Sequence, residues 1–225
     1  AQLIVVVGQN PGTNHPRMLT ALERAKRRGA TIVAVNPLPE TGLVRFKNPQ
    51  SVRGLLGGGT RLADEWLQIR LGGDQALFQA IGALLLRWDD ERRAAGEPAL
   101  LDHAFIASST RGFEAYAGHV RDLDWDRTLA ATGLTREQIE RTARRFAGST
   151  ATIVCWAMGL TQHPHAVATI RDIASVLFLQ GNLGRPGAGL CPVRGHSNVQ
   201  GDRTMGIWER PPEPFLAALD AEFGI

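Results

Sequence analysis

The chain has 225 residues, 44% of them hydrophobic and 21% charged, with a formal net charge of +3. This composition is typical of a globular protein and excludes the disordered, fibrous and disulfide-scaffolded classes. The apolar runs, such as residues 83–86, are far shorter than the roughly 20 residues that cross a membrane, and no secretory signal precedes them. We therefore expect a protein without a membrane span.

The cysteines and the basic residues each exclude a class of site. Cys155 and Cys191 lie far apart in the sequence, with no further Cys or His at metal-ligand spacing. This pattern excludes a CxxC redox motif and a zinc knuckle, and we expect a cytoplasmic protein. The Arg clusters at 24–28 and 141–145 lie near Glu residues, which indicates solvated helix faces. Nucleic-acid binding is the weakest of the functions considered, and we expect none.

The first third of the chain predicts a βαβ unit. Residues 3–7 form a continuous apolar, β-branched run, typical of a strand that is buried on both faces. Turn residues follow at 8–14, and Pro16 opens an amphipathic helix. The apolar run at 31–35 predicts a second strand, parallel to the first. Because a buried strand follows Ala1 directly, we expect this chain to be a segment of a longer protein.

The middle of the chain predicts mainly helices. Residues 38–62 are rich in Pro and Gly and predict a long surface loop, and a short strand is predicted within 63–70. Asp74 is a suitable N-cap for an apolar-periodic helix over 75–93. A helical region follows from about residue 101 to 146 and contains a Thr-Arg-Glu-Gln capping box.

The last third of the chain returns to alternating strands and helices. Residues 152–156 predict a third buried strand, and a helix is expected from near Pro164 to about residue 179. The glycine-rich stretch at 181–189 predicts neither helix nor strand. His15, His163 and His165 lie at or near helix starts and are interpreted as cap or surface residues.

These elements together predict an α/β fold. We expect a doubly wound, mainly parallel sheet with helices on both faces, which is a Rossmann-like cofactor-binding architecture. Its domain is predicted to span residues 1–196, and residues 197–225 are expected to lead into a neighbouring domain. The loops at 8–15 and 157–163 are expected to share one edge of this sheet.

The residues at the ends of the predicted strands indicate the chemistry. Segments 8–15, 36–37, 71–74 and 158–163 carry glycine, amide, hydroxyl and proline residues. None pairs a Ser or Cys with a His, or two carboxylates, as hydrolases require. Glycine turns and helix N-termini instead suit a large phosphorylated, nucleotide-like cofactor. GxGxxG and Walker motifs are absent, which disfavours an NAD or ATP site.

The order of these motifs resembles that of the molybdopterin oxidoreductases. Within that superfamily the chain is similar to the central part of a formate-dehydrogenase-like alpha subunit, across nearly all of its length. The motifs that carry the resemblance are Gly8–Pro11 (GQNP), Asn36–Pro37 (NP), Leu71–Asp74 (LGGD), Met158–Gln162 (MGLTQ), Gly181–Gly189 (GNLGRPGAG) and Pro192–Gly201 (PVRGHSNVQG).

The resemblance implies a bis(molybdopterin guanine dinucleotide) cofactor that carries molybdenum or tungsten. This domain would hold one of its two pterin–nucleotide arms. The implied cofactor-binding residues are Gly8, Asn10, Asn14, Asn36, Pro37, Gly72 and Asp74 at the guanosine–pyrophosphate end, Met158, Gly159 and Gln162 nearer the pterin, and Gly195.

Two further residues are implied to be catalytic. Arg194 matches the family's arginine beside the metal, where its bidentate fork would orient a small anionic substrate such as formate. His196 follows it, where formate dehydrogenases commonly have Gln, and it changes the proton chemistry expected there. Those enzymes also commonly have Asp where Asn36 stands, although an amide can still face guanine. Arg194 as a structural ion pair or phosphate contact, and His196 as a plain loop residue, remain the alternatives.

The resemblance also implies what this segment lacks. The family's metal-ligating Cys or selenocysteine and any iron–sulfur cysteines lie N-terminal to it, so we expect no metal ligand here and no activity of the segment alone. Expected partners are the small anionic substrate, the flanking domains and a redox partner subunit. The predicted function is two-electron oxidation of formate or a similar anion by the parent. The alternative is a non-catalytic scaffold or subunit-contact relative that keeps the fold.

Overall fold

The computed structural model describes residues 1–195, 199–207 and 211–224. The chain divides into two compact units, Ala1–Val193 and Arg194–Ile225. The predicted domain boundary after residue 196 lies within residues 196–198, which the structure does not describe, so it stays a prediction. Among the described residues, no helix combines the length and the apolar character needed to span a membrane.

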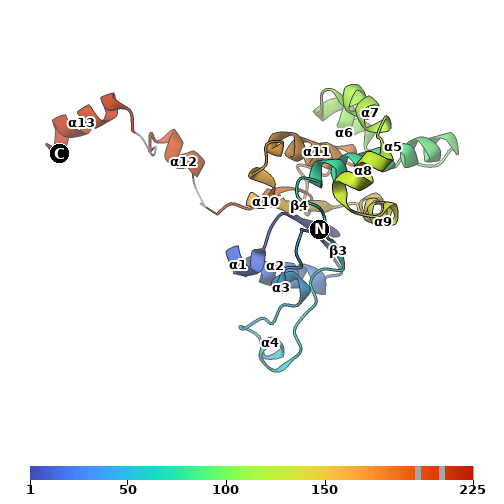
Figure 1. Ribbon diagram of the computed structural model, residues 1–225, viewed down its shortest axis with the longest axis horizontal. Coiled ribbons are helices and arrows are strands. Elements are labelled where there is room, and N and C mark those ends of the chain that lie inside the picture. The colour runs from blue at the N-terminus through green and yellow to red at the C-terminus, as the bar shows by residue number, and fades with distance from the viewer. Residues whose placement is uncertain (196–198, 208–210, 225) are drawn as a thin grey trace. The chain divides into compact units, whose positions relative to one another are not determined.

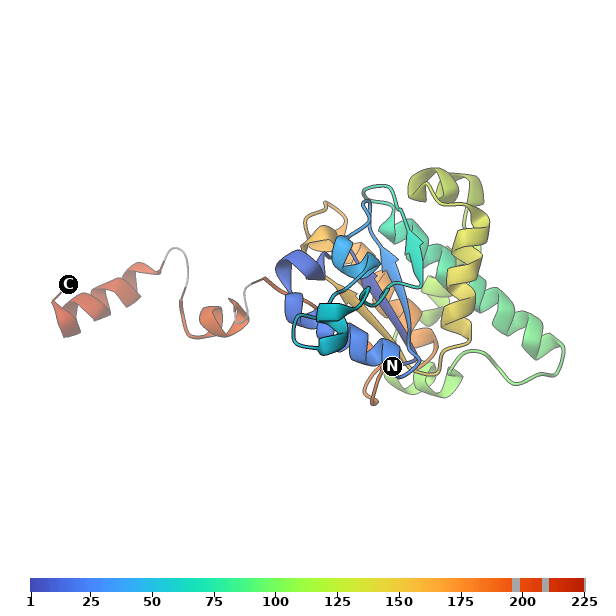
Figure 2. The ribbon, with the colours of Figure 1, turned by 90° about the horizontal axis from the view of Figure 1, so that it is seen from below.

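The first unit is built on a parallel sheet (Figures 1 and 2). Its strands are β1 (Leu3–Val7), β2 (Thr31–Val35), β3 (Glu65–Leu67), β4 (Thr152–Trp156) and β5 (Gly189–Pro192). The strand order is β3-β2-β1-β4-β5, and every neighbouring pair is parallel. The three buried strands predicted from apolar runs are confirmed, and so is the mainly parallel α/β class.

Helices cover both faces of this sheet. Alternate strand residues belong to two separate apolar clusters, so that Val5 and Val33 lie on one face and Val6 and Ala34 on the other. The first face is covered mainly by α5 (Asp74–Ala94), α9 (Arg136–Ala147) and α11 (Ala166–Leu179), and the second by α2 (Pro16–Arg27) and α3 (Thr41–Val44). Burial on both faces explains why the strands are continuously apolar.

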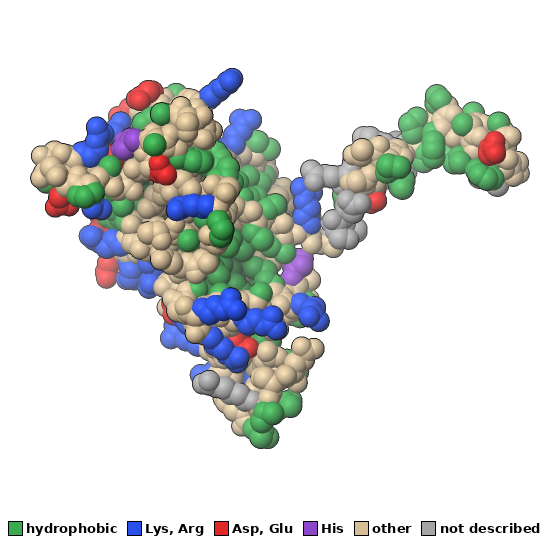
Figure 3. Space-filling model, turned by 180° about the vertical axis from the view of Figure 1, so that it is seen from behind, with side chains coloured by type: hydrophobic (Ala, Val, Ile, Leu, Met, Phe, Trp, Pro, Cys, Tyr) green, Lys and Arg blue, Asp and Glu red, His purple; other side chains and the backbone are tan. Residues whose placement is uncertain are grey.

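The prediction of a long surface loop at 38–62 was wrong. The segment contains the short helices α3 and α4 (Val52–Leu56), and Phe46 and Thr60 exchange backbone hydrogen bonds of 2.8 Å. Leu43 and Leu62 are fully buried in the cluster on the α2 side of the sheet. These apolar residues are too widely spaced among turn residues to produce a helical or strand period. Hydrophobic side chains remain exposed on α4, at the lower end of the first unit in Figure 3.

The connection from β3 to α5 differs from the prediction in two details. The predicted strand at 63–70 is confined to β3, which pairs with residues 33–35 of β2. Helix α5 begins at Asp74 rather than at residue 75, and Gly73, not Asp74, is its N-cap. The backbone of Gly73 already has helical dihedral angles, which moves the helix start back by one residue.

The predicted helical region consists of four helices in the described chain. They are α6 (His103–Ser109), α7 (Phe113–Arg121), α8 (Trp125–Thr132) and α9. The capping box is confirmed, because the Thr135 hydroxyl accepts from the Gln138 amide and the Gln138 side chain accepts from the Thr135 amide. On α9, Arg136 pairs with Glu140 and Arg141 with Glu137 at the expected i,i+4 spacing. Arg141 and Arg145 both reach Glu65 on β3.

The predicted turns after β1 and β4 each contain one helical turn. These are α1 (Pro11–Asn14) and α10 (Met158–Thr161). The second unit contains α12 (Val199–Thr204) and α13 (Glu213–Phe223). None of the residues of α13 is buried, and Phe215, Leu216 and Phe223 are exposed.

Candidate functional site

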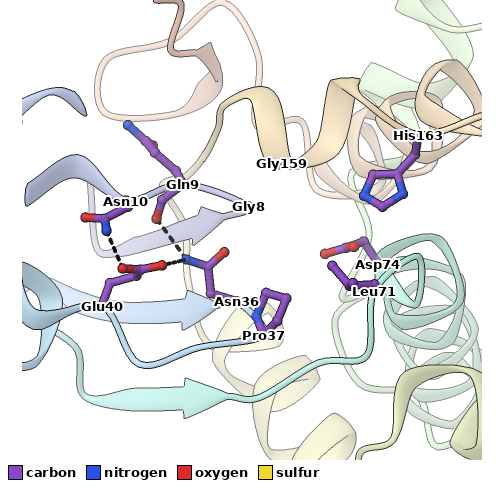
Figure 4. Close-up of a pocket in the computed structure, with 10 residues that line it drawn as sticks. All are labelled: Gly8, Gln9, Asn10, Asn36, Pro37, Glu40, Leu71, Asp74, Gly159 and His163. Carbon is purple, nitrogen blue, oxygen red and sulfur yellow. Dashed lines mark hydrogen bonds between the residues drawn. The ribbon is translucent and has the colours of Figure 1, made fainter. Parts of the chain in front are cut away.

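A pocket of about 220 Å³ opens at the carboxyl ends of β1, β2 and β4. The chain proceeds from β1 outward to β2 and β3, and then crosses to β4 on the other side of β1. Ligands of doubly wound folds bind at such a reversal of strand order. The lining residues are Gly8, Gln9, Asn10, Asn36, Pro37, Glu40, Leu71, Asp74, Gly159 and His163 (Figure 4).

Two glycines join the loops on either side of the pocket. The Gly159 amide donates a hydrogen bond of 3.1 Å to the carbonyl oxygen of Gly8, so the loops at 8–15 and 157–163 do share one edge of the sheet. A Cβ atom on Gly159 would lie 2.5 Å from that oxygen, and one on Gly8 would lie 3.0 Å from the Gly159 backbone. Gly8 also has a φ of +56°, which favours glycine. These glycines therefore allow the two loops to touch.

One wall of the pocket is a network of two amides and a carboxylate. Asn36 is buried, and its Nδ2 donates to the Gln9 carbonyl oxygen at 3.0 Å and to Glu40 Oε1 at 3.3 Å. The Asn10 Nδ2 donates to the other oxygen of Glu40, and the Asn10 Oδ1 accepts from the Thr13 amide at 3.1 Å. Because both contacts of the Asn36 nitrogen are with acceptors, its carbonyl oxygen turns toward the middle of the pocket (Figure 4).

The opposite wall carries a buried carboxylate. Asp74, the first residue of α5, is 7% exposed and points into the pocket with the His163 ring above it (Figure 4). Burial raises the pKa of Asp74 to about 6, although its own backbone N–H and the charge of His163 act to lower the pKa. The ionised carboxylate therefore lacks sufficient compensation for its lost hydration, and an N–H donor from a ligand would supply it.

The side chains that line the pocket present hydrogen-bond acceptors to a ligand. The Asn36 carbonyl oxygen and the Asp74 carboxylate face the same cavity from opposite sides. The Glu40 carboxylate is occupied by the two amide nitrogens that it orients. The pocket is therefore suited to a ligand group that carries several N–H donors.

Part of the predicted cofactor-binding set meets at this pocket. Gly8, Asn10, Asn36, Pro37, Asp74 and Gly159 line it. Asn14, Gly72, Met158 and Gln162 are exposed and are not among the lining residues. Arg194 and Gly195 belong to the second unit, and His196 lies outside the described residues. The roles predicted for all of these residues stay predictions.

Four lining residues are not in the predicted set: Gln9 and Leu71, which lie within the motifs GQNP and LGGD, and the charged or titratable residues Glu40 and His163. Glu40 lies in the segment taken for a surface loop, and its signal was a carboxylate three residues beyond Pro37 at the end of a predicted strand. His163 was interpreted as a cap or surface residue, but it lines the pocket and influences Asp74. Its signal was its position in the segment that follows β4.

Comparisons with known proteins agree on one family. Residues 1–207 match the family model described as molybdopterin oxidoreductase. An uncharacterized oxidoreductase of Mycobacterium tuberculosis is 57% identical over 225 residues, which are 100% of this chain and 28% of that protein. Protein YdeP of Escherichia coli is 45% identical over 223 residues, covering 99% and 29%. Formate dehydrogenase H of Escherichia coli is 34% identical over 205 residues, covering 91% and 25%.

A solved structure has a similar fold. Acetylene hydratase from Pelobacter acetylenicus matches with a TM-score of 0.66 at 19% identity, over 83% of this chain and 22% of that chain. The chain thus spans less than a third of the length of the relatives that it matches. It belongs to the molybdopterin oxidoreductase family, and this membership implies a molybdopterin cofactor with molybdenum or tungsten.

Proposed function

We propose that this chain binds the guanosine end of molybdopterin guanine dinucleotide in the pocket at the ends of β1, β2 and β4. The observation that carries the proposal is the pair of inward-facing acceptors, the Asn36 carbonyl oxygen and the Asp74 carboxylate. Guanine offers N–H donors at N1 and at its exocyclic N2, and these match two acceptors on one cavity. The raised pKa of Asp74 supports the same fit, because a donor from the base would offset the cost of burying the charge.

The volume of the pocket suits one end of a long cofactor rather than the whole of it. Complete small-molecule sites usually measure roughly 300–1,000 Å³, and this cavity measures about 220 Å³. It would hold the base, while the remainder of the cofactor continues past the backbones of Gly8 and Gly159. Glu40 acts as a positioning residue, because it holds the Asn10 and Asn36 amides in the orientation that directs the Asn36 oxygen inward.

We further propose that the whole protein oxidises formate or a similar small anion. When bound, the cofactor supplies two-electron redox chemistry at its metal. Arg194 would bind the anionic substrate through two parallel N–H bonds, and His196 would supply a titratable group beside it. The second cofactor arm, an iron–sulfur cluster and the contact with a redox partner subunit would belong to parts of the protein outside this chain, and the location would be cytoplasmic. The resemblance of the 192–201 motif and the identity with formate dehydrogenase H support this proposal.

The cofactor content of an Asp74→Asn variant of the full-length protein tests the pocket. Acid hydrolysis releases guanosine monophosphate from the dinucleotide cofactor, and its amount is measured per molecule of protein. Losing the charge-assisted bond from the base should weaken cofactor retention by about 10- to 100-fold. Asp126→Asn is the matched control, because Asp126 also lies in the first turn of a helix but is exposed. Unchanged guanosine content and retention in Asp74→Asn would refute the assignment of this pocket.

A further inference from the structure

The two cysteines of the chain stand opposite each other on neighbouring strands. Cys155 on β4 is in register with Cys191 on β5. Facing residues on adjacent parallel strands are about 4.7–4.9 Å apart and point to the same side of the sheet. Both cysteines contact the apolar cluster on the α2 side. This spacing lies within the range of about 4.4–6.8 Å between Cα atoms that a disulfide spans.

The two thiols differ in exposure. Both are free, but Cys155 is 4% exposed whereas Cys191 is half-buried, on the last strand of the described sheet. A hydrogen bond from the Cys155 thiol to the Cys191 sulfur lowers the pKa of Cys191, and the same contact together with burial raises the pKa of Cys155. Cys191 is therefore the accessible thiol with more thiolate character, which is the reactive form. Cys155 is a protected neighbour within reach.

We propose that Cys155 and Cys191 form a redox-active dithiol that hydrogen peroxide converts to a disulfide between β4 and β5. The Cys191 thiolate attacks one peroxide oxygen, so that an S–O bond forms, the O–O bond breaks, and the departing hydroxide takes up the proton that Cys191 had released and becomes water. The Cys155 sulfur then attacks the Cys191 sulfur, so that the S–S bond forms, the S–O bond breaks, and the released oxygen leaves as a second water with the Cys155 proton. Two thiols lose two electrons in total, and peroxide gains them.

The Cys155–Cys191 disulfide would link β5 covalently to β4. Strand β5 pairs with β4 alone among the described strands, and it ends at Pro192, two residues before Arg194 in the sequence. A covalent link at Cys191 would restrain this strand and would also capture the sulfenic acid before it is oxidised further. The proposal is independent of what the pocket binds, because it rests on the register of β4 and β5.

Peptide mass mapping of the full-length protein tests the proposal. Trypsin separates the cysteines because Arg171 lies between them. After brief treatment with hydrogen peroxide, the expected product is one linked pair of peptides that contain Cys155 and Cys191, and dithiothreitol should separate it. Before oxidation, iodoacetamide should label Cys191 at least about tenfold faster than Cys155.

Two variants test whether Cys191 attacks the peroxide and whether Cys155 then forms the disulfide. In Cys155→Ala, Cys191 should proceed to sulfinic acid that dithiothreitol does not reverse. In Cys191→Ala, Cys155 should remain a thiol at the same peroxide dose. The proposal is overturned if the unmodified protein accumulates sulfinic acid at Cys191 with no linked peptide, or if Cys191 links only to another cysteine. Because the first result is read on the unmodified protein, a variant that fails to fold does not affect it.

Discussion

The amide of Gly159 donates a hydrogen bond of 3.1 Å to the carbonyl oxygen of Gly8, and this contact joins the loops that follow β1 and β4. The two strands are neighbours at the point where the strand order reverses. Because neither residue has a side chain, the loop backbones meet directly and form the pocket wall between Asn36 and His163. The glycines at this edge are therefore required for loop packing, whatever ligand is bound.

Gly159→Ala should disrupt this contact. The added Cβ would lie 2.5 Å from the Gly8 oxygen, so the two loops must separate. We expect the free energy of unfolding to fall by about 1–3 kcal/mol, measured by urea denaturation. Gly118→Ala in α7 is the control, because nothing lies within 4 Å of its added Cβ and alanine favours helix. Equal stability of the two variants would contradict the packing role of Gly159.

Asp74 should make the stability of the protein depend on pH between about 4 and 6. Its pKa rises from an ordinary 3.8 to about 6 on folding, so the folded state binds the proton more tightly than the unfolded state. The resulting stabilisation is complete below pH 3.8 and is lost as the pH rises through 6. Asp74→Asn should therefore increase the stability of the cofactor-free protein above pH 6, by up to about 3 kcal/mol.

Thermal unfolding of Asp74→Asn and Asp126→Asn from pH 4 to pH 8 checks this effect. The stability gain of Asp74→Asn should grow as the pH rises and level off above about pH 7. The exposed Asp126 should give a nearly constant difference from the unmodified protein. A gain from Asp74→Asn that does not change with pH would show that the Asp74 pKa is not raised.

Glu65 should stabilise the contact between β3 and α9. Its carboxylate is 5% exposed and accepts from Arg141 at 2.7 Å and from Arg145 at 2.6 Å. Glu65→Gln removes the charge from both bonds and should lower the free energy of unfolding by about 1–3 kcal/mol. Glu137→Gln removes an exposed partner of Arg141 and should cost less than about 0.5 kcal/mol. Denaturant titration of both variants measures the difference.

Arg194→Lys should separate substrate binding from cofactor binding. Lysine keeps the positive charge but loses the planar fork that binds two oxygens of one anion. In the full-length protein we expect a raised KM for the anionic substrate, with metal and guanosine content unchanged. Loss of the cofactor instead would identify Arg194 as a cofactor anchor.

His196→Gln should flatten any change of rate near pH 6.5, because an amide does not titrate there.

The centre of the sheet could be predicted because β1, β2 and β4 are nearly continuous apolar runs in the sequence. Apolar side chains point to both faces of the strand in residues 3–7, 31–35 and 152–156, which is typical of strands that are buried on both faces. The convergence of Asn36 and Gly159 then followed from the geometry of parallel strands, since their carboxyl ends meet at one edge. The same rule brought Asp74 to the pocket from the start of the next helix.

What could not be predicted depends on contacts between distant residues. Glu40 acquires its role only through the amides of Asn10 and Asn36, and the sparse apolar residues around it gave no period. The contact between Cys155 and Cys191 depends on the register of β4 and β5, which neither strand specifies by itself. Cys155 and Cys191 form no CxxC motif in the sequence, and only the pairing of the two strands brings them together.

An experimental structure of the full-length protein loaded with its cofactor tests the guanosine pocket most directly. We predict a guanine base in the pocket between β2 and α5, with its N–H groups within about 3.2 Å of the Asp74 carboxylate and of the Asn36 carbonyl oxygen. A guanosine bound elsewhere on the protein, with Asp74 and Asn36 facing only water, would contradict it.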